Sequence, residues 1–359
     1  MRKQRRIALM VAVLFAVGVL LSACGQADQA GGGEDKLKVG LVFDVGGRGD
    51  LSFNDMAYEG LNRAAEEFGD RIEVKYLEPT GGGENREELL RMLAEEGYDL
   101  IFGVGFLFTE HIQKVAAEFP DTHFALIDGY IADLTEDSNV VCLLFKEHEG
   151  SFLVGAAAAL ATETNKIGFV GGMQIPLIER FEAGYHAGAK YINPDIEVLV
   201  DYIGTTSEAF KDPFKGKELA MAQYDAGADI VYHASGASGT GVFEAAVAKD
   251  KLAIGVDADQ SLTASEEQRP HILTSMLKRV DVAVYNIIAA EVKGEYKGGY
   301  HIFGLADDGV GYAVNEYNEA MIEPYKAKLE ELKQKIISGE IVVPVNNAEL
   351  EQFLQDLGS

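Results

Sequence analysis

Cysteine is scarce in this chain, whose 359 residues include only Cys24 and Cys142. Two cysteines are too few for a disulfide framework or for a cysteine-based metal site. The seven histidines form no HxH or HxxxH pair, so we expect neither a zinc site nor any other cofactor. Cys142 lies in the apolar run 140–145, which reads as a buried strand, and is expected to be a small core residue.

Positive charge is also in short supply. The chain has 31 Lys and Arg residues against 58 Asp and Glu residues, which gives a formal net charge of -27. A protein that binds nucleic acid meets the phosphate backbone with Lys and Arg, so we expect no nucleic-acid partner. The same imbalance argues against a polyphosphate substrate. Hydrophobic residues at 47% and charged residues at 25% are ordinary for a globular protein, and the length suggests about two domains.

The start of the chain has the pattern of an export signal. Several basic residues precede the apolar run 7–21, which is short for a membrane-spanning helix but typical of a signal-peptide core. The run ends in LSACG, which resembles a bacterial lipobox. We therefore expect residues 1–23 to be a lipoprotein signal peptide, Cys24 to carry the lipid, and the Gly-rich segment 24–36 to be a flexible tether. A plain secretory signal and an uncleaved anchor are the alternatives.

From residue 37 onward, strand-like runs alternate with amphipathic helices, which predicts parallel βαβ units. The first set of strands is expected at 38–44, 72–77, 99–103 and 123–128, with helices at 54–68, 89–96 and 109–119. Asn54 is a candidate N-cap and Gly69 a candidate C-terminal stop of the first helix. A further charged amphipathic helix is expected over 316–338.

The same order of strands then recurs at a nearly constant spacing. Residues 166–170, 196–198, 229–231 and 253–257 repeat the patterns of 38–42, 72–74, 99–101 and 125–128. Such a repeat indicates two lobes of one architecture, each an open α/β sheet. Asp44, Asp128 and Asp257 each close a predicted strand. Because ligands bind beyond the carboxyl ends of the strands in such sheets, we expect these acids to meet in a cleft between the lobes.

Two phenylalanines stand in polar loops just before predicted helices, Phe53 in the first half and Phe210 in the second. One ring from each lobe would sandwich a planar ligand, and stacking of this kind contributes about 1–3 kcal/mol per base in nucleic-acid complexes. Local packing is the alternative interpretation of both residues.

Polar residues near these rings suit the rest of such a ligand. Asn54 and Asp128 offer groups for the edge of a heterocycle, although Asn54 also competes for the cap role. Asp257 suits a vicinal diol such as that of ribose, and Lys278 is a candidate partner for its charge. The Gly-rich turn 235–241 follows a strand and offers backbone N–H groups.

An enzyme is not favoured. The loop GGRG at 46–49 does not have GxGxxG spacing, and Asp44 and Asp50 flank it where a phosphate needs positive potential. No nucleophile with an adjacent base stands out, which argues against a nucleoside hydrolase or a dinucleotide oxidoreductase.

The set of motifs resembles the basic membrane lipoprotein family, the PnrA-like purine-nucleoside receptors of bacterial ABC transporters. The resemblance runs in order over about residues 37–312. The segments that carry it are the lipobox, DVGGRGDLSFN, FALIDG, FKDPFKGKELA, YDAGADIVYHASGASGTGVFEAA, IGVDADQ and ILTSMLKRVDVAVY.

This resemblance implies an α/β fold of the type I periplasmic-binding-protein class, with two Rossmann-like lobes and parallel sheets joined by a three-strand hinge. Lobe 1 is expected at 37–145 plus 262–292, and lobe 2 at 146–261 plus 293–359. In such a receptor Phe53 and Phe210 stack on the base, Asn54 and Asp128 bind its edge, and Asp44, Gly236, Asp257 and Lys278 hold the ribose. Two segments depart from the family pattern: 204–209 lengthens the loop before Phe210, and 236–239 reads GASG instead of GGTG.

The function implied is that of a substrate-binding component held by lipid at the extracytoplasmic face of the cell membrane. It is expected to be a monomer that binds adenosine, guanosine or inosine and passes the nucleoside to ABC permease subunits. A sugar receptor or a sensory receptor of the same fold is the alternative, and a nucleoside-processing enzyme is less favoured.

Overall fold

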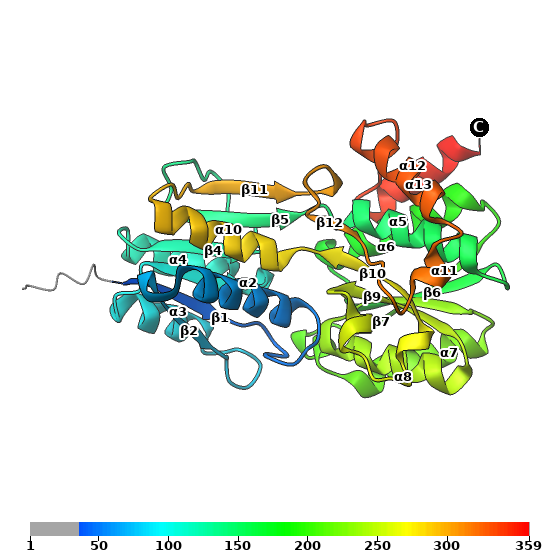
Figure 1. Cartoon of the computed structure of the whole chain (residues 1–359), viewed down its shortest axis with the longest axis horizontal. Helices are drawn as coiled ribbons and strands as arrows, with labels where there is room; N and C mark the ends of the chain where they lie inside the picture. The colour runs from blue at the N-terminus through cyan, green and yellow to red at the C-terminus, as the bar shows by residue number, and fades with distance from the viewer. Residues whose placement is uncertain (1–35, 359) are drawn as a thin grey trace, which may run out of the picture. The chain divides into compact units, whose positions relative to one another are not determined.

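The computed structural model describes residues 36–358 (Figure 1). The expected signal peptide 1–23, the lipidation site Cys24 and the tether up to residue 35 lie outside the described residues. From Leu37 onward the chain forms one compact unit. None of the helices in this described part has both the length and the apolar composition needed to cross a membrane.

The first lobe is built on a six-stranded sheet in the order β11-β5-β4-β3-β1-β2. Its strands are β1 (Leu37–Val42), β2 (Ile72–Leu77), β3 (Leu100–Val104), β4 (His123–Ile127), β5 (Val140–Phe145) and β11 (Gly299–Phe303). Every neighbouring pair is parallel. Strands β3 and β5 are almost entirely buried apolar runs, as is typical of a parallel sheet covered on both faces.

The second lobe repeats this arrangement. Its sheet has the order β12-β10-β9-β8-β6-β7, and all pairs are parallel except β10 with β12. Its strands are β6 (Lys166–Met173), β7 (Glu197–Gly204), β8 (Ile230–Ala234), β9 (Leu252–Asp257), β10 (Ile272–Lys278) and β12 (Val310–Tyr312). The order β4-β3-β1-β2 matches β9-β8-β6-β7, which confirms the internal repeat and the α/β class with two parallel-sheet lobes.

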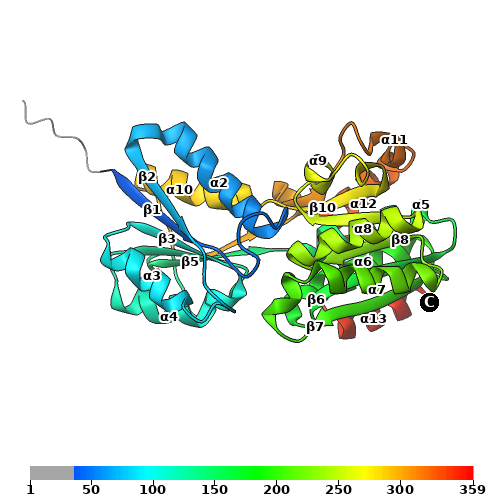
Figure 2. The ribbon, with the colours of Figure 1, turned by 90° about the horizontal axis from the view of Figure 1, so that it is seen from below.

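Helices cover both faces of each sheet. In the first lobe they are α2 (Phe53–Phe68), α3 (Arg86–Glu95), α4 (Thr109–Glu118) and α10 (Val280–Lys293). In the second they are α5 (Glu147–Ala161), α6 (Pro176–Ile192), α7 (Pro213–Asp225), α8 (Gly239–Lys249), α9 (Gln260–Thr263), α11 (Glu319–Ile322), α12 (Lys326–Ile337) and α13 (Asn347–Leu357). Figure 2 shows α2 and α10 on one side of the first sheet and α3 and α4 on the other. In the second lobe α5 packs on α6, and α7 on α8.

Short 3-10 helices complete the described chain, at Gly69–Arg71, Phe106–Phe108, Ser207–Phe210, Gly236–Ser238, Arg269–His271 and Leu305–Asp307.

The chain passes between the two sheets three times within the described residues: from β5 to β6, from β10 to β11, and from β11 to β12. The expected lobe boundaries were wrong in two places. Segment 262–292 was assigned to lobe 1, but its strand β10 lies in the second sheet and only α10 packs on lobe 1, against α2. Segment 293–359 was assigned to lobe 2, but β11 lies in the first sheet. The cause is that the repeated unit has five strands, whereas the sequence showed four. The fifth strand is β5 in the first sheet, next to β4, and β10 in the second sheet, next to β9.

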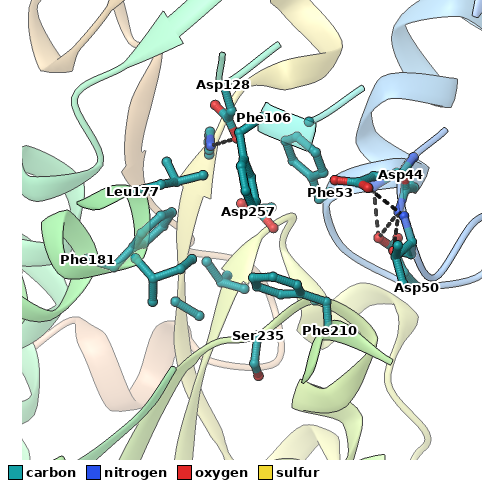
Figure 3. Close-up of a pocket in the computed structure, with 18 residues that line it drawn as sticks. Asp44, Asp50, Phe53, Phe106, Asp128, Leu177, Phe181, Phe210, Ser235 and Asp257 are labelled. Atoms are coloured by element: carbon teal, nitrogen blue, oxygen red, sulfur yellow. Dashed lines mark hydrogen bonds and ion pairs between the residues drawn. The ribbon is translucent and has the colours of Figure 1, made fainter. Parts of the chain in front are cut away.

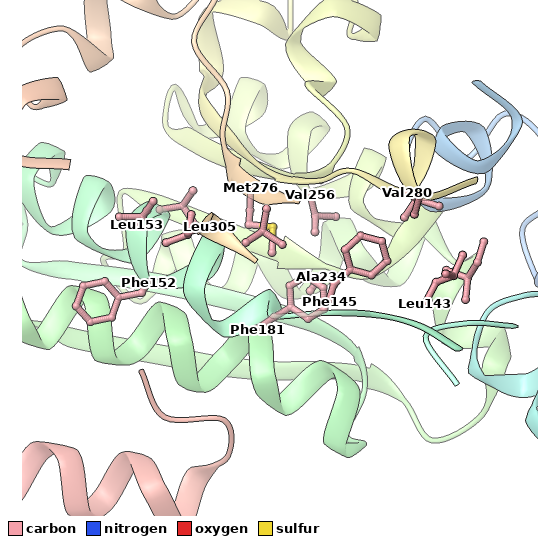
Figure 4. Packing of buried hydrophobic residues seen from close by; sticks show 14 of the residues in the cluster. Leu143, Phe145, Phe152, Leu153, Phe181, Ala234, Val256, Met276, Val280 and Leu305 are labelled. Carbon is pink, nitrogen blue, oxygen red and sulfur yellow. The ribbon is translucent and has the colours of Figure 1, made fainter. Parts of the chain in front are cut away.

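A continuous apolar core extends through the segments that join the lobes. Buried side chains from β5, α5, α6, β10 and the start of α10 pack together there, including Phe145, Phe152, Phe181, Met276 and Val280 (Figure 4). Separate clusters lie under α3 and α4 in the first lobe and under α7 and α8 in the second. Cys142 is buried in the first-lobe cluster, as expected.

Two local predictions need correction. The single helix expected over 316–338 is two helices, α11 and α12, because Pro324 between them lacks the N–H that a continuous helix needs. Its apolar stripe does pack on the second lobe, where α12 contacts α5. Helix α2 begins at Phe53, so Asn54 is not its N-cap. Gly69, with φ 51, ends this helix as predicted.

Candidate functional site

A pocket lies where the carboxyl ends of the two sheets meet (Figure 3). All of the ligand-binding positions expected from the sequence line it, namely Asp44, Phe53, Asn54, Asp128, Phe210, Gly236, Asp257 and Lys278. The structure therefore brings together residues that are more than two hundred positions apart in the chain.

The two predicted phenylalanines enter the pocket from different lobes. Phe53 is the first residue of α2, and Phe210 ends the 3-10 helix Ser207–Phe210 after β7. Both side chains are half-buried, and Figure 3 shows both rings directed into the cavity. The longer loop at 204–209 thus does not carry Phe210 away from the pocket.

The ring of Phe210 is seated on the backbone of β6. A Cβ placed on Gly172 would lie 2.3 Å from the Cε1 atom of Phe210, so no larger residue fits beneath the ring in this position. The Ser238 hydroxyl ties the loop in place, because it donates to the Ala209 carbonyl at 2.8 Å and accepts from the Asp212 N–H at 2.7 Å. Gly236 in the same turn adopts φ 56, a conformation that favours glycine.

Asp44 and Asn54 are held by each other and by their neighbours. The Asn54 Oδ1 atom accepts from the Asp44 backbone N–H at 2.9 Å, and the Asp44 Oδ1 atom lies 3.3 Å from the buried Arg86 guanidinium. Burial raises the pKa of Asp44 to about 6, although the Val45 N–H and Arg86 oppose that rise. Asn54 is therefore fixed at the pocket wall rather than acting as a helix cap.

Asp50 performs the capping that was expected of Asn54. Its carboxylate accepts from the backbone N–H groups of Ser52, Asn54 and Asp55 at 2.8–3.1 Å. Asp50 is buried, and burial raises its pKa to about 6 against these hydrogen bonds. An acid at a helix N-terminus is favourably placed, so Asp50 fixes the start of α2 and with it the position of Phe53.

Lys278, the last residue of β10, is buried with 1% of its surface exposed. Its ammonium lies 2.5 Å from the Asp128 Oδ2 atom and 3.2 Å from the Glu147 Oε1 atom. Lys278 was a candidate partner for the Asp257 charge; its close ion pairs are with Asp128 and Glu147, and it acts on Asp257 only by attraction over a longer distance. Burial alone favours neutral lysine, but these carboxylates hold the pKa of Lys278 above its ordinary value. The ammonium also lies 5.2 Å from the ring centre of Phe53, a cation–π contact.

The two carboxylate oxygens of Asp128 differ in their contacts. Its Oδ2 atom binds Lys278, whereas its Oδ1 atom is buried without a hydrogen-bond partner among the described residues. A buried polar atom of this kind is uncommon and calls for a partner.

Asp257 ends β9 and also lines the pocket. Its Oδ2 atom accepts from the Ser52 hydroxyl of the first lobe at 2.5 Å. Burial raises the pKa of Asp257 to about 7, with Lys278 and Ser52 opposing that rise.

Sequence reasoning missed part of the lining. Phe106, Leu177 and Phe181 also face the cavity in Figure 3. Phe106 begins the 3-10 helix after β3 among apolar neighbours, so it lacks the polar surroundings that identified Phe53 and Phe210. Leu177 and Phe181 lie on α6, where an apolar residue reads as ordinary core. The described residues contain no group of His, Cys, Asp and Glu side chains suited to a metal ion.

Comparison with known proteins agrees with this geometry. Residues 37–347 match the family described as ABC transporter substrate-binding protein PnrA-like. An uncharacterized lipoprotein of Pyrococcus furiosus is 37% identical, with 98% of this chain and 96% of that protein covered. The ABC transporter nucleoside-binding protein BmpA of Lactococcus lactis is 35% identical, with 95% of this chain and 99% of that protein covered.

A solved structure has the same fold. The crystal structure of a solute-binding protein of an ABC transporter system from Aeropyrum pernix has a TM-score of 0.77 and 35% sequence identity, and the match covers 90% of this chain and 97% of that one. The fold, the pocket between the lobes and the extent of the sequence match lead to one conclusion: this chain belongs to the PnrA-like family of ABC transporter substrate-binding proteins.

Proposed function

We propose that the pocket binds a nucleoside of the adenosine, guanosine or inosine type, which the protein delivers to the permease of an ABC transporter. One observation carries the proposal: two half-buried phenylalanines from opposite lobes line the same cavity as a set of buried carboxylates. This combination suits a ligand with a flat ring at one end and hydroxyl groups at the other.

The base would stack between Phe53 and Phe210. Both rings are fixed before the ligand binds. Asp50 caps the start of α2, where Phe53 lies, and the Phe210 ring packs directly on Gly172. Side chains fixed in advance lose little entropy when the ligand arrives, which favours affinity.

The edge of the base would be bound by Asp128 and Asn54. The unpartnered Asp128 Oδ1 atom accepts a hydrogen bond from a ring N–H or an exocyclic amino group. The Asn54 amide is already bonded to the Asp44 N–H and to the Asp50 carboxylate, the latter at 3.0 Å, so it serves mainly through the remaining lone pair on Oδ1.

The ribose would be held by Asp44, Asp257, Lys278 and the Gly236 turn. A carboxylate accepts hydrogen bonds from the hydroxyl groups of a diol. The Lys278 ammonium has three N–H donors and uses one of them on Asp128, so donors remain for the ligand. The glycine at 236 leaves the backbone open to close approach. Four acids in the lining, Asp44, Asp50, Asp128 and Asp257, would repel a phosphate, so a nucleoside suits the pocket better than a nucleotide.

We propose further that the protein is anchored by lipid on Cys24 at the extracytoplasmic face of the membrane. The support is the apolar leader with its lipobox and the lipoprotein name of the relative from Pyrococcus furiosus. In cells that export the protein, Cys24→Ala should move it from the membrane fraction to the soluble one, and a variant that stays in the membrane fraction would overturn this anchor.

Isothermal titration calorimetry tests the ligand. We expect guanosine, inosine or adenosine to bind, with ribose and AMP weaker by at least about tenfold because each lacks or disturbs one half of the contacts. Ribose bound as tightly as the nucleosides would favour a sugar receptor and contradict the stacking argument. Free base released during the titration would point instead to an enzyme.

A further inference from the structure

The loop that carries Phe53 is bonded directly to the opposite lobe. The Leu51 carbonyl accepts from the Gln260 Nε2 atom at 3.0 Å, and the Ser52 hydroxyl donates to the Asp257 Oδ2 atom at 2.5 Å. Leu51 and Ser52 precede α2 of the first lobe, whereas in the second lobe Asp257 ends β9 and Gln260 follows it. Phe53 is the next residue in the chain.

We infer that these two hydrogen bonds, the inter-lobe clasp, position Phe53 and hold the lobes together around the ligand, which makes Gln260 and Ser52 positioning residues of the binding site. The inference rests on the proposed inter-lobe binding site but not on which nucleoside fills it.

Gln260 is fixed so that its amide N–H faces the first lobe. Its Oε1 atom accepts from the Val256 N–H at 2.8 Å and lies 3.0 Å from the His233 Nε2 atom, both within the second lobe. The side chain is buried with 1% exposure, and Gly255 leaves the space for it, since a Cβ there would lie 2.7 Å from Oε1. The second lobe therefore holds this donor ready, and the first lobe supplies the acceptor.

The first lobe presents that acceptor through an unusual backbone conformation. Leu51 adopts φ 54, in the left-handed region that non-glycine residues seldom enter. The Asp50 carboxylate holds the following turn through the Ser52 and Asn54 N–H groups. Such a conformation persists where the surroundings fix it, and here the surroundings include a residue of the other lobe.

Ser52 couples the clasp to the ligand. It is fully buried, and the Asp257 carboxylate that accepts its hydrogen bond also lines the pocket. The clasp bonds join the lobes, so they are made only when the lobes are together. A ligand that needs the lobes together binds more weakly when the closed form is less populated, in proportion to that population.

Single-molecule energy transfer between the lobes tests the inference. The full chain with Cys24→Ser would carry fluorophores on Glu88→Cys of α3 and Glu218→Cys of α7, both exposed positions on different lobes. We expect Ser52→Ala to lower the closed population, with and without inosine, and to speed inosine dissociation by about tenfold, which lies within the usual range of coupling between sites. Ser52→Thr keeps the hydroxyl donor, so its closed population and its inosine dissociation rate should stay near those of the parent protein.

Two further variants separate the clasp from simple loss of stability. Gln260→Met removes the second clasp bond and should also favour the open form. Thr274→Val is the matched control, because it removes a buried hydroxyl whose bond to the Ala313 carbonyl, at 2.8 Å, stays within the second lobe. It should leave the distance distribution and the dissociation rate unchanged.

The outcomes are distinct. If Ser52→Ala and Gln260→Met leave the distance distribution and the dissociation rate unchanged, as Thr274→Val should, the clasp is overturned. Lobes that stay apart in the unaltered protein with and without inosine would overturn it as well. If no nucleoside binds but the free protein still closes less in the two variants, the clasp stands and the proposed ligand fails.

Discussion

Lys278 and Asp128 form a buried ion pair between the two sheets, with the ammonium 2.5 Å from the carboxylate although one residue ends β10 and the other follows β4. Only 1% and 3% of the two side chains are exposed. Glu147 adds a second carboxylate at 3.2 Å and is itself bound by Arg180 at 2.8 Å. A charge network shared by the lobes thus borders the pocket, and Lys278 is the cation that joins its two carboxylates.

Removal of that lysine charge should be costly. Lys278→Met leaves Asp128 buried without its cation, and loss of one partner of a buried pair typically costs about 3–5 kcal/mol of unfolding free energy. Denaturant unfolding measures this. Lys297→Met is the control, since its pair with Glu136 at 2.8 Å is exposed and should contribute less than about 1 kcal/mol. Similar losses in both variants would refute the special role of Lys278.

Loss of the stacking ring should weaken nucleoside binding. We expect Phe53→Ala to raise the dissociation constant at least about tenfold, as stacking of about 1–3 kcal/mol per base implies. Phe214→Ala is the control, because Phe214 is 79% exposed and belongs to the same stretch of loop and helix as Phe210. Calorimetry with inosine compares the two, and a loss of only twofold for Phe53→Ala would reduce that ring to local packing.

The seat of Phe210 can be tested without touching the ring. Gly172→Ala places a methyl group 2.3 Å from the Phe210 Cε1 position, so the ring must move and nucleoside affinity should fall by about tenfold, as for loss of one stacked base. Gly311→Ala on β12 meets no atom within 4 Å and should bind like the parent protein. Equal affinities in the two variants would show that the position of Phe210 does not matter.

The raised pKa of Asp257 predicts a pH-dependent stability. An acid with a pKa of about 7 in the folded state and the usual lower value in the unfolded state binds more protons when folded, so stability is lost as pH rises from about 4 to 7. Asp257→Asn stays neutral and should lack this loss. Over that range the free energy of unfolding of the variant should rise relative to that of the parent protein by a few kcal/mol, since one pKa unit corresponds to about 1.4 kcal/mol. This difference should level off above pH 7.

Denaturant unfolding of the ligand-free proteins at several pH values between 4 and 8 measures the difference. A constant difference across the range would mean that Asp257 titrates normally.

Much of this site was predictable because its residues stand at recognisable places. Asp44, Asp128 and Asp257 follow strands, and parallel strands bring their carboxyl ends to one edge. Phe53 and Phe210 stand out because each is an apolar ring in a polar stretch just before a helix. Phe106 did not stand out, because it lies in the apolar stretch GFLF after β3.

The remaining contacts depend on tertiary structure that no local pattern encodes. Glu147 looks like any acid at a helix start, yet the fold buries it beside Lys278. Gln260 lies at the start of a four-residue helix, and its role follows only from the approach of Leu51 from the other lobe. Strand β10 reads equally well as part of either lobe, because nothing in its own sequence names its neighbours and the whole sheet decides which strand it pairs with.

A crystal structure of the protein with inosine bound tests the central claim most directly. The account predicts the purine ring between Phe53 and Phe210, the Asp128 carboxylate at its edge, and the ribose hydroxyls against Asp44 and Asp257. Inosine found elsewhere, or found in this pocket with either phenylalanine turned away from the base, would contradict it.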